Sequence, residues 1–148
     1  MSESADMAGS TGERLPFFVY GTLRPGGRHH AWALRGRTVR EEPARMAGLV
    51  LYQGPGYPYA VAGEGEVRGE LVVPRPGEYE EVLRVLDELE EYRPGDPANV
   101  YERVAAEARP LVGGVERAWV YLAAAPLAAR LRAEGVLIAG GDWAKADR

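Results

Sequence analysis

The clearest periodic pattern of apolar residues lies near the middle of the chain, in residues 78–92. Apolar side chains recur there at intervals of three and four residues, at Tyr79, Val82, Leu83, Leu86 and Leu89. This spacing places them on one face of an α-helix. The segment 94–97 that follows contains two prolines and a glycine, which continue a helix poorly. The pattern therefore predicts one long amphipathic helix that ends near residue 92.

Short apolar runs separated by glycine and proline fill most of the remaining sequence. They predict strands at residues 15–20, 46–52, 57–62, 67–73, 100–108 and 115–122. Gly113 and Gly114 mark a turn between the last two. Shorter helices are expected at residues 30–34 and 126–134, the second with Pro126 in its first turn. Strand-rich halves on either side of one long helix predict an α+β domain, with the helix packed on a small twisted barrel.

Composition adds the domain boundaries. The chain has 148 residues, of which 46% are hydrophobic and 27% charged, as is typical of one globular domain. Residues 1–14 are small, polar and acidic, so we expect a disordered tail there and a single domain at residues 15–148. No apolar run reaches the roughly 20 residues of a membrane span, and residues 1–14 lack the apolar core of a secretory signal. We therefore expect a soluble, cytoplasmic protein with no membrane partner.

Charge and residue types exclude several functions. The net charge is −4 and the 17 arginines are spread along the chain, so nucleic acid is not expected as a partner. The chain has no cysteine, and its serines all lie in residues 1–14, which excludes a thiol or serine nucleophile in the domain. His29 and His30 are adjacent and would point apart, which argues against a metal site. No cofactor is expected, and carboxylate acid/base chemistry remains.

One acid of the predicted helix is directed at the core. At about 100° per residue with Leu86 at zero, Glu90 falls near +40°, roughly within the apolar stripe, and Asp87 lies at its border at about 100°. Burial, the neighbouring carboxylates and the negative end of the helix dipole should all raise the pKa of Glu90 toward neutrality. A general base works best when its pKa is close to the pH at which the reaction runs. The sequence therefore makes Glu90 a candidate acid/base.

Two other environments for Glu90 stay open at this point. Its carboxylate could pair with a core arginine such as Arg103, or the helix could end before residue 90 and leave the side chain in water. Arg103 itself could neutralise a substrate carboxylate, although a structural ion pair is favoured. Trp32 and Trp119 are expected in the core.

Five short motifs, taken in order, resemble the γ-glutamylcyclotransferase-like superfamily, also described as avirulence-induced-gene-like proteins. They are FVYGTLR at residues 18–24, LDELE at 86–90, YER at 101–103, AWVY at 118–121 and GDW at 141–143. The resemblance implies a small mixed β-barrel with flanking helices and a cavity that accepts a γ-glutamyl group. One departure is that Glu91 follows Glu90, where members of the family often carry glycine.

The resemblance also implies a reaction and its residues. A γ-glutamyl amide would release 5-oxoproline and a free amine, with Glu90 as the catalytic acid/base. The backbone of Gly21, Thr22 and Leu23 would hold the substrate carboxylate or the developing oxyanion, and Tyr20 and Tyr121 would line the cavity, although each is equally suited to a barrel core. Gly21 alone could equally mark a plain turn that needs its backbone angles. The departing amine is expected to meet the loops at 53–57 and 93–99.

Three functions of different classes remain. The first is the cyclotransferase, whose partner is a small γ-glutamyl substrate. The second is a non-catalytic small-molecule binding module with the same cavity. The third is a protein-interaction domain, which predicts an exposed apolar patch and no cleft. The sequence does not determine the departing amine or the oligomeric state.

Overall fold

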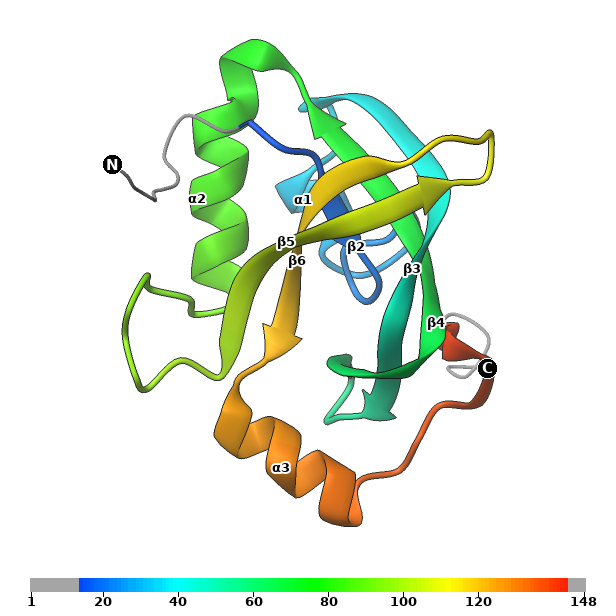
Figure 1. The fold of residues 1–148 in the computed structure, drawn as a ribbon. Helices are drawn as coiled ribbons and strands as arrows, with labels where there is room; N and C mark the ends of the chain where they lie inside the picture. Colours follow the sequence, from blue (N-terminus) through cyan, green and yellow to red (C-terminus); the bar gives the residue numbers. More distant parts are fainter. Residues whose placement is uncertain (1–13, 144–148) are drawn as a thin grey trace, which may run out of the picture.

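A closed barrel of five strands forms the centre of the computed structural model, which describes residues 14–143 (Figure 1). In barrel order the strands are β2 (Phe17–Val19), β4 (Pro58–Pro74), β3 (Thr38–Gln53), β5 (Tyr101–Pro110) and β6 (Glu116–Ala123). Neighbouring strands are antiparallel except β2 and β6, which are parallel and close the barrel. The mixed barrel is the expected fold. The predicted tail lies outside the described residues, except for Arg14.

Strands β3 and β4 are longer than the apolar runs that predicted them. The runs at 57–62 and 67–73 belong to one strand, β4, and β3 begins at Thr38, eight residues before the predicted start at 46. Of the exposed residues 62–66, Ala62 and Glu66 pair with Leu49 and Ala47 of β3, on either side of a register shift. Backbone hydrogen bonds hold a ladder together even where the side chains face water. Patterns of apolar residues therefore underestimate the length of such strands.

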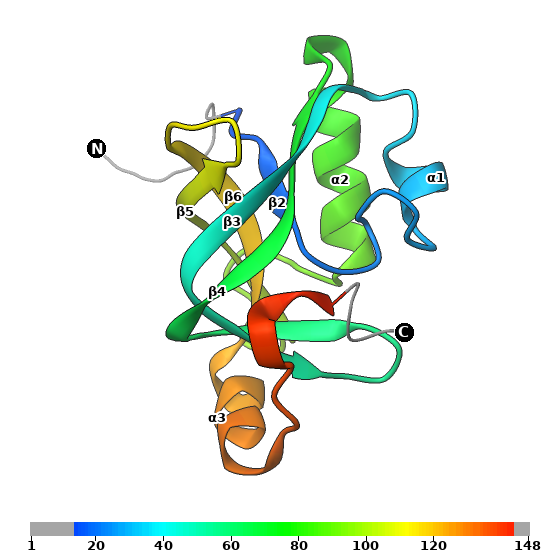
Figure 2. The same ribbon diagram turned by 90° about the vertical axis from the view of Figure 1, so that its right-hand side faces the viewer.

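Five helical segments lie around the barrel within residues 14–143, and the last of them is a 3₁₀ turn, η2 (Ala139–Gly141). A 3₁₀ turn, η1 (Pro76–Glu78), leads into α2 (Tyr79–Leu89), which lies along one side of the barrel in both views (Figures 1 and 2). A short helix, α1 (His30–Ala33), lies between β2 and β3, and α3 (Ala125–Glu134) covers one end, with Pro126 in its first turn as expected. None of the helices within residues 14–143 is long and apolar enough to span a membrane.

The core has two main layers that share strand β2. Phe18 points into the barrel interior beside Met46 and Leu71, whereas Phe17 and Val19 point outward to α2. Alternate residues of a strand face opposite sides of a sheet, so an unbroken apolar run suits a strand that is covered on both faces. The apolar stripe of α2 closes the outer layer, with Tyr79, Val82, Val85 and Leu86 buried.

The two tryptophans that were expected in the core have different environments. Trp119 on β6 is partly buried and packs against the layer under α2. Trp32 is 54% exposed, so the expectation of a core position was wrong for this residue. Its helix, α1, is a single turn at the surface that buries only Ala33.

Candidate active site

A cavity of about 240 Å³ opens between the end of α2, the loop after β2 and the first residues of β4 and β5. Six of the seven candidate site residues line it: Tyr20, Gly21, Thr22, Leu23, Glu90 and Tyr121. These residues come from three distant parts of the chain, and closure of the barrel brings them together. The presence of this cavity contradicts the third alternative, which predicted a surface without a cleft.

Glu90 is the C-cap residue of α2 and lies in the cavity wall. Its backbone N–H still donates to the carbonyl oxygen of Leu86 at 3.0 Å, which carries the helical path one residue further and keeps the side chain on the core side. Burial raises the pKa of Glu90 to about 7, and the nearby Asp87 carboxylate contributes to the rise. Near neutral pH the group therefore exists in both protonation states, as a proton carrier requires.

Neither of the two other environments considered for Glu90 is found. The helix does end at Leu89 rather than at residue 92, but Glu90 is partly buried in the cavity wall. Arg103 pairs with Asp87 instead, its Nε donating to Oδ1 at 3.0 Å. The structural ion pair favoured for Arg103 is thus present, with a different partner.

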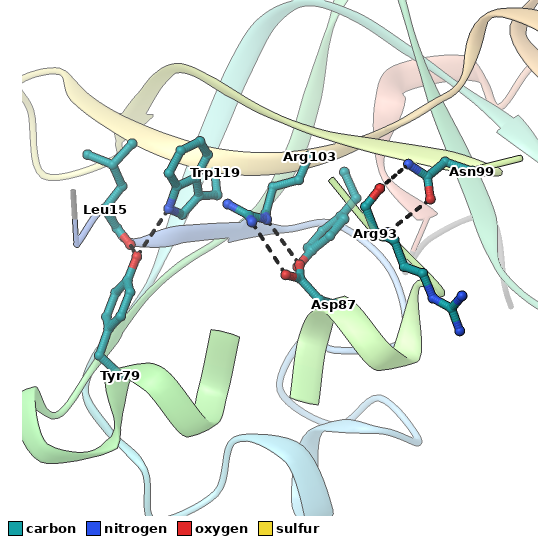
Figure 3. Close-up of polar contacts among 8 residues, drawn as sticks. Leu15, Tyr79, Asp87, Arg93, Asn99, Arg103 and Trp119 are labelled. Atoms are coloured by element: carbon teal, nitrogen blue, oxygen red, sulfur yellow. Dashed lines mark hydrogen bonds and ion pairs between the residues drawn. The ribbon is translucent and has the colours of Figure 1, made fainter. Parts of the chain in front are cut away.

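Asp87 is the centre of a polar cluster that includes Arg103 (Figure 3). The Tyr121 hydroxyl donates to Asp87 Oδ1 at 2.5 Å, and the Arg103 guanidinium lies over the ring of Trp119, 4.7 Å from its centroid. Arg103 does not line the cavity, so it reaches the site only through Asp87 and Tyr121. Sequence reasoning gave Asp87 no role, although its place at the border of the apolar stripe was a signal.

Tyr20 and Tyr121 lie both in the core and in the cavity wall. They are only 7% and 6% exposed, and the Tyr20 hydroxyl donates to the backbone carbonyl of Tyr121 at 2.5 Å. Burial raises the pKa of each phenol well above its ordinary value. Both therefore remain neutral hydrogen-bonding groups at physiological pH.

The loop after β2 lines the cavity with Gly21, Thr22 and Leu23. No described residue accepts a hydrogen bond from the N–H of Gly21, Thr22 or Leu23, so these donors are open to a ligand. Gly21 does not adopt a left-handed backbone. A Cβ on Gly21 would lie 2.9 Å from Cδ of Pro58, so glycine is required there by close packing and not by backbone angles.

Two sets of contacts hold this loop in place. The Thr22 Oγ1 and His29 Nδ1 atoms are 2.7 Å apart, and the His29 backbone N–H donates to the Thr22 carbonyl. Arg24 pairs with Glu70 of β4 at 2.7 Å and with Asp142 at 2.9 Å. The GDW segment near the end of the chain thus anchors the YGTL segment near its beginning.

The loops expected to meet a departing amine differ in their position. Tyr57, from the 53–57 loop, lines the cavity, as do Arg28, His29, Glu91 and Val100. The 93–99 loop contributes no residue to the wall. It is closed on itself by Asn99, which is hydrogen-bonded to the backbone N–H and carbonyl of Arg93 (Figure 3). Within residues 14–143 no group of three potential ligands could hold a metal ion.

Comparison with known families identifies a close match over most of the chain. The sequence model of the family described as "Gamma-glutamyl cyclotransferase, AIG2-like" matches residues 17–145. A curated relative from Niallia circulans, gamma-L-glutamyl-butirosin B gamma-glutamyl cyclotransferase, is 36% identical over 106 residues. The match covers 71% of this chain and 64% of the relative, so this chain spans less than two thirds of that protein's length.

Solved structures show the same fold. An uncharacterized protein from Pyrococcus horikoshii superposes with a TM-score of 0.60 at 26% identity, over 90% of this chain and 92% of its own. An AIG2-like protein from Mus musculus gives a TM-score of 0.58, also at 26% identity, over 76% of this chain and 80% of its own.

Proposed function

This chain belongs to the AIG2-like gamma-glutamyl cyclotransferase family, and from that premise we propose that it releases 5-oxoproline and a free amine from a γ-glutamyl amide. The observation that carries the proposal is the position of Glu90. A carboxyl with a pKa of about 7 lies in the wall of the same cavity as the open N–H groups of the loop after β2. A candidate base and candidate hydrogen-bond donors thus line one cavity, which supports the proposal.

The substrate supplies its own nucleophile in this reaction. Glu90 as carboxylate accepts a proton from the α-ammonium group of the γ-glutamyl moiety, whose pKa is roughly 8 in a free α-amine. The resulting amine attacks the γ-carbonyl carbon, a new C–N bond closes a five-membered ring, and the carbonyl electrons move to oxygen. Because the step is intramolecular, positioning supplies much of the rate.

Collapse of the tetrahedral intermediate completes the reaction. The N–H groups of Gly21, Thr22 and Leu23 stabilise the oxyanion or the substrate carboxylate. The protonated Glu90 donates its proton to the departing nitrogen as the original C–N bond breaks. The ring nitrogen loses its second proton to water, which leaves neutral lactam, free amine and the Glu90 carboxylate. This course needs no cysteine or serine, and the described domain contains neither.

Asp87 and Arg103 are positioning residues, which act on Glu90 and do not contact the substrate. Asp87 raises the pKa of Glu90 by charge repulsion and accepts the Tyr121 hydroxyl, and Arg103 holds Asp87 in place. We assign Arg103 this supporting role and not a direct contact with substrate. Tyr20 and Tyr121 form the wall against which the γ-glutamyl chain packs.

The first test is a Glu90→Gln variant assayed for 5-oxoproline release from a panel of γ-glutamyl amides. The amide has nearly the same shape but accepts no proton, so we expect kcat to fall by at least about 100-fold, the contribution typical of general acid–base catalysis. Glu88→Gln is the matched control, because Glu88 is exposed on the same helix and does not line the cavity. It should retain wild-type activity.

Equal release of 5-oxoproline by the wild type and Glu90→Gln across the panel would refute the acid/base role of Glu90, and no release by either protein would refute the enzymatic proposal. Binding of γ-glutamyl amides without release of 5-oxoproline by either protein would instead support the second alternative, a binding module with the same cavity.

A further inference from the structure

His29 takes no step in the proposed reaction, yet it contacts the loop that the reaction uses. His29 and Thr22 both line the cavity, and both are partly buried. The His29 Nδ1 atom lies 2.7 Å from Thr22 Oγ1, and the His29 backbone N–H donates to the Thr22 carbonyl at 3.1 Å. His29 therefore holds Thr22 through its side chain and its main chain together.

The segment that carries His29 packs directly on Thr22. A Cβ on Gly27 would lie 2.3 Å from the Thr22 carbonyl oxygen, so glycine permits this approach. The Gly27 N–H donates to the Arg24 carbonyl at 2.7 Å, and the Arg24 N–H donates to the Gly21 carbonyl at 3.0 Å. The chain from residue 21 to residue 29 thus folds back on itself, and the contact between His29 and Thr22 joins its two ends.

The hydrogen bonds inside this loop leave one group of donors unused. Several later N–H groups donate to carbonyls of the loop itself, whereas those of Gly21, Thr22 and Leu23 have no acceptor among the described residues. Donors that are fixed before a ligand arrives bind it more tightly, because less conformational freedom is lost on binding. The contacts that fix Thr22, the middle residue of the three, therefore affect how well the loop can bind.

The ring of His29 is also held in orientation. The Trp32 ring meets it edge-on, with the centroids 5.7 Å apart and the planes at 86°. Burial and the charge of Arg28 lower the pKa of His29, so the ring is neutral at pH 7. A neutral imidazole has one donor and one acceptor nitrogen, and a hydroxyl can act as either. Nδ1 can therefore hydrogen-bond to Thr22 in both tautomers.

On the basis of the proposed function, we propose that His29 is a positioning residue, whose hydrogen bond to the Thr22 hydroxyl holds the loop after β2 in the conformation that binds the γ-glutamyl end of the substrate. The effect of His29 is then transmitted through Thr22. It is the same for all substrates that share the γ-glutamyl end, whereas a direct contact with the departing group would vary with that group.

The test is a double-mutant cycle between the two residues, measured as kcat/KM for 5-oxoproline release. Wild type, His29→Leu, Thr22→Val and the double variant are assayed with γ-glutamyl-alanine and γ-glutamyl-ethylamide. Leucine removes the imidazole, and valine replaces the hydroxyl with a methyl group. The matched control is His30→Asn, because the neighbouring His30 pairs with Glu41 at 2.7 Å and does not line the cavity.

We expect His29→Leu and Thr22→Val each to lower kcat/KM about fivefold, the size of one hydrogen bond's net contribution. Both remove the same hydrogen bond, so the double variant should lie within about twofold of either single variant. The falls should be equal for the two amides, and His30→Asn should match the wild type. Effects that multiply to about 25-fold in the double variant would show that the two residues act independently and would overturn the assignment.

His29→Asn separates hydrogen bonding from simple packing of the ring. The asparagine amide reaches the position of Nδ1 and can donate or accept there, so this variant should recover most of the activity that His29→Leu loses. An asparagine variant as impaired as His29→Leu, no fall for His29→Leu, or a fall confined to one amide would each contradict the proposal. Urea unfolding of every variant establishes that the assayed protein is folded.

Failure of the proposed reaction is distinguishable from failure of this assignment. If the wild type releases 5-oxoproline from no amide of the panel, the proposed function fails. Calorimetric binding of the same two amides to the same variants then decides the role of His29. Affinity that His29→Leu and Thr22→Val lower without adding to each other supports it. Equal affinities, or no binding by the wild type, refute it.

Discussion

Three acids at the end of α2 show how strongly one residue's surroundings set its role. Glu88 is exposed and pairs with Arg84 at 2.7 Å. Glu90, two positions later, lies in the cavity wall with a pKa near 7. Glu91 is the one described residue other than glycine with a positive φ, 53°. The helical projection identified Glu90 from sequence, because a helix turns by a constant angle. It gave no information on the backbone of Glu91.

Glu91 adopts a left-handed backbone, which favours glycine, and this predicts a stability change. Glu91→Gly should leave stability unchanged or raise it by up to about 1 kcal/mol, since relief of the strained backbone outweighs the added freedom of the unfolded chain. Glu88→Gly, within the regular helix, should lower stability by about 1 kcal/mol. Urea unfolding measures both. A Glu91→Gly variant that is destabilised as much as Glu88→Gly would contradict this explanation.

Strand β2 connects the core to the site. Its three residues pack on both faces, and the loop that follows carries Tyr20 to Leu23 into the cavity. Sequence predicted this strand, because an apolar run closed by glycine has few other structures available. The merging of two runs into β4 was not predictable, because its exposed part is held by pairing with β3 and not by burial.

Close contact between β2 and β4 predicts the consequence of adding one methyl group. A Cβ at Gly69 would lie 2.2 Å from the carbonyl oxygen of Val19, so Gly69→Ala must push β2 and β4 apart. We expect a loss of about 2–3 kcal/mol in the free energy of unfolding, as for other overpacked sites. The control is Gly77→Ala, where a Cβ would meet nothing within 4 Å. Equal stability of the two variants in urea unfolding would show that the strands can separate without loss.

The position of Glu90 in the cavity wall makes the free energy of unfolding of the whole protein depend on pH. The folded protein holds the Glu90 proton up to a pKa of about 7, against an ordinary value of 4.5. Between these two values the folded state binds more protons than the unfolded state, so stability falls as pH rises. The carboxylate that the proposed reaction needs is therefore the form that destabilises the fold, a common opposition between activity and stability.

This opposition predicts that Glu90→Gln gains stability relative to the wild type as pH rises. The difference between the two proteins should increase by on the order of 3 kcal/mol between pH 5 and pH 8, because the neutral amide has no ionisation to oppose. Urea unfolding at several pH values measures it. Glu88→Gln, whose side chain is exposed, should differ from the wild type by a constant amount over this range. A flat difference for Glu90→Gln would mean that the Glu90 carboxyl is not shielded from water.

The sequence by itself determined the helix, most strands and the direction of Glu90, because hydrophobic periodicity and turn residues act over a few neighbouring positions. It also limited the chemistry through the residue types that are absent. Tertiary structure alone decided which carboxylate pairs with Arg103 and that the loop after β2 lines the same cavity as Glu90. These depend on barrel closure, which brings together residues from distant parts of the chain, and no local pattern specifies their distances.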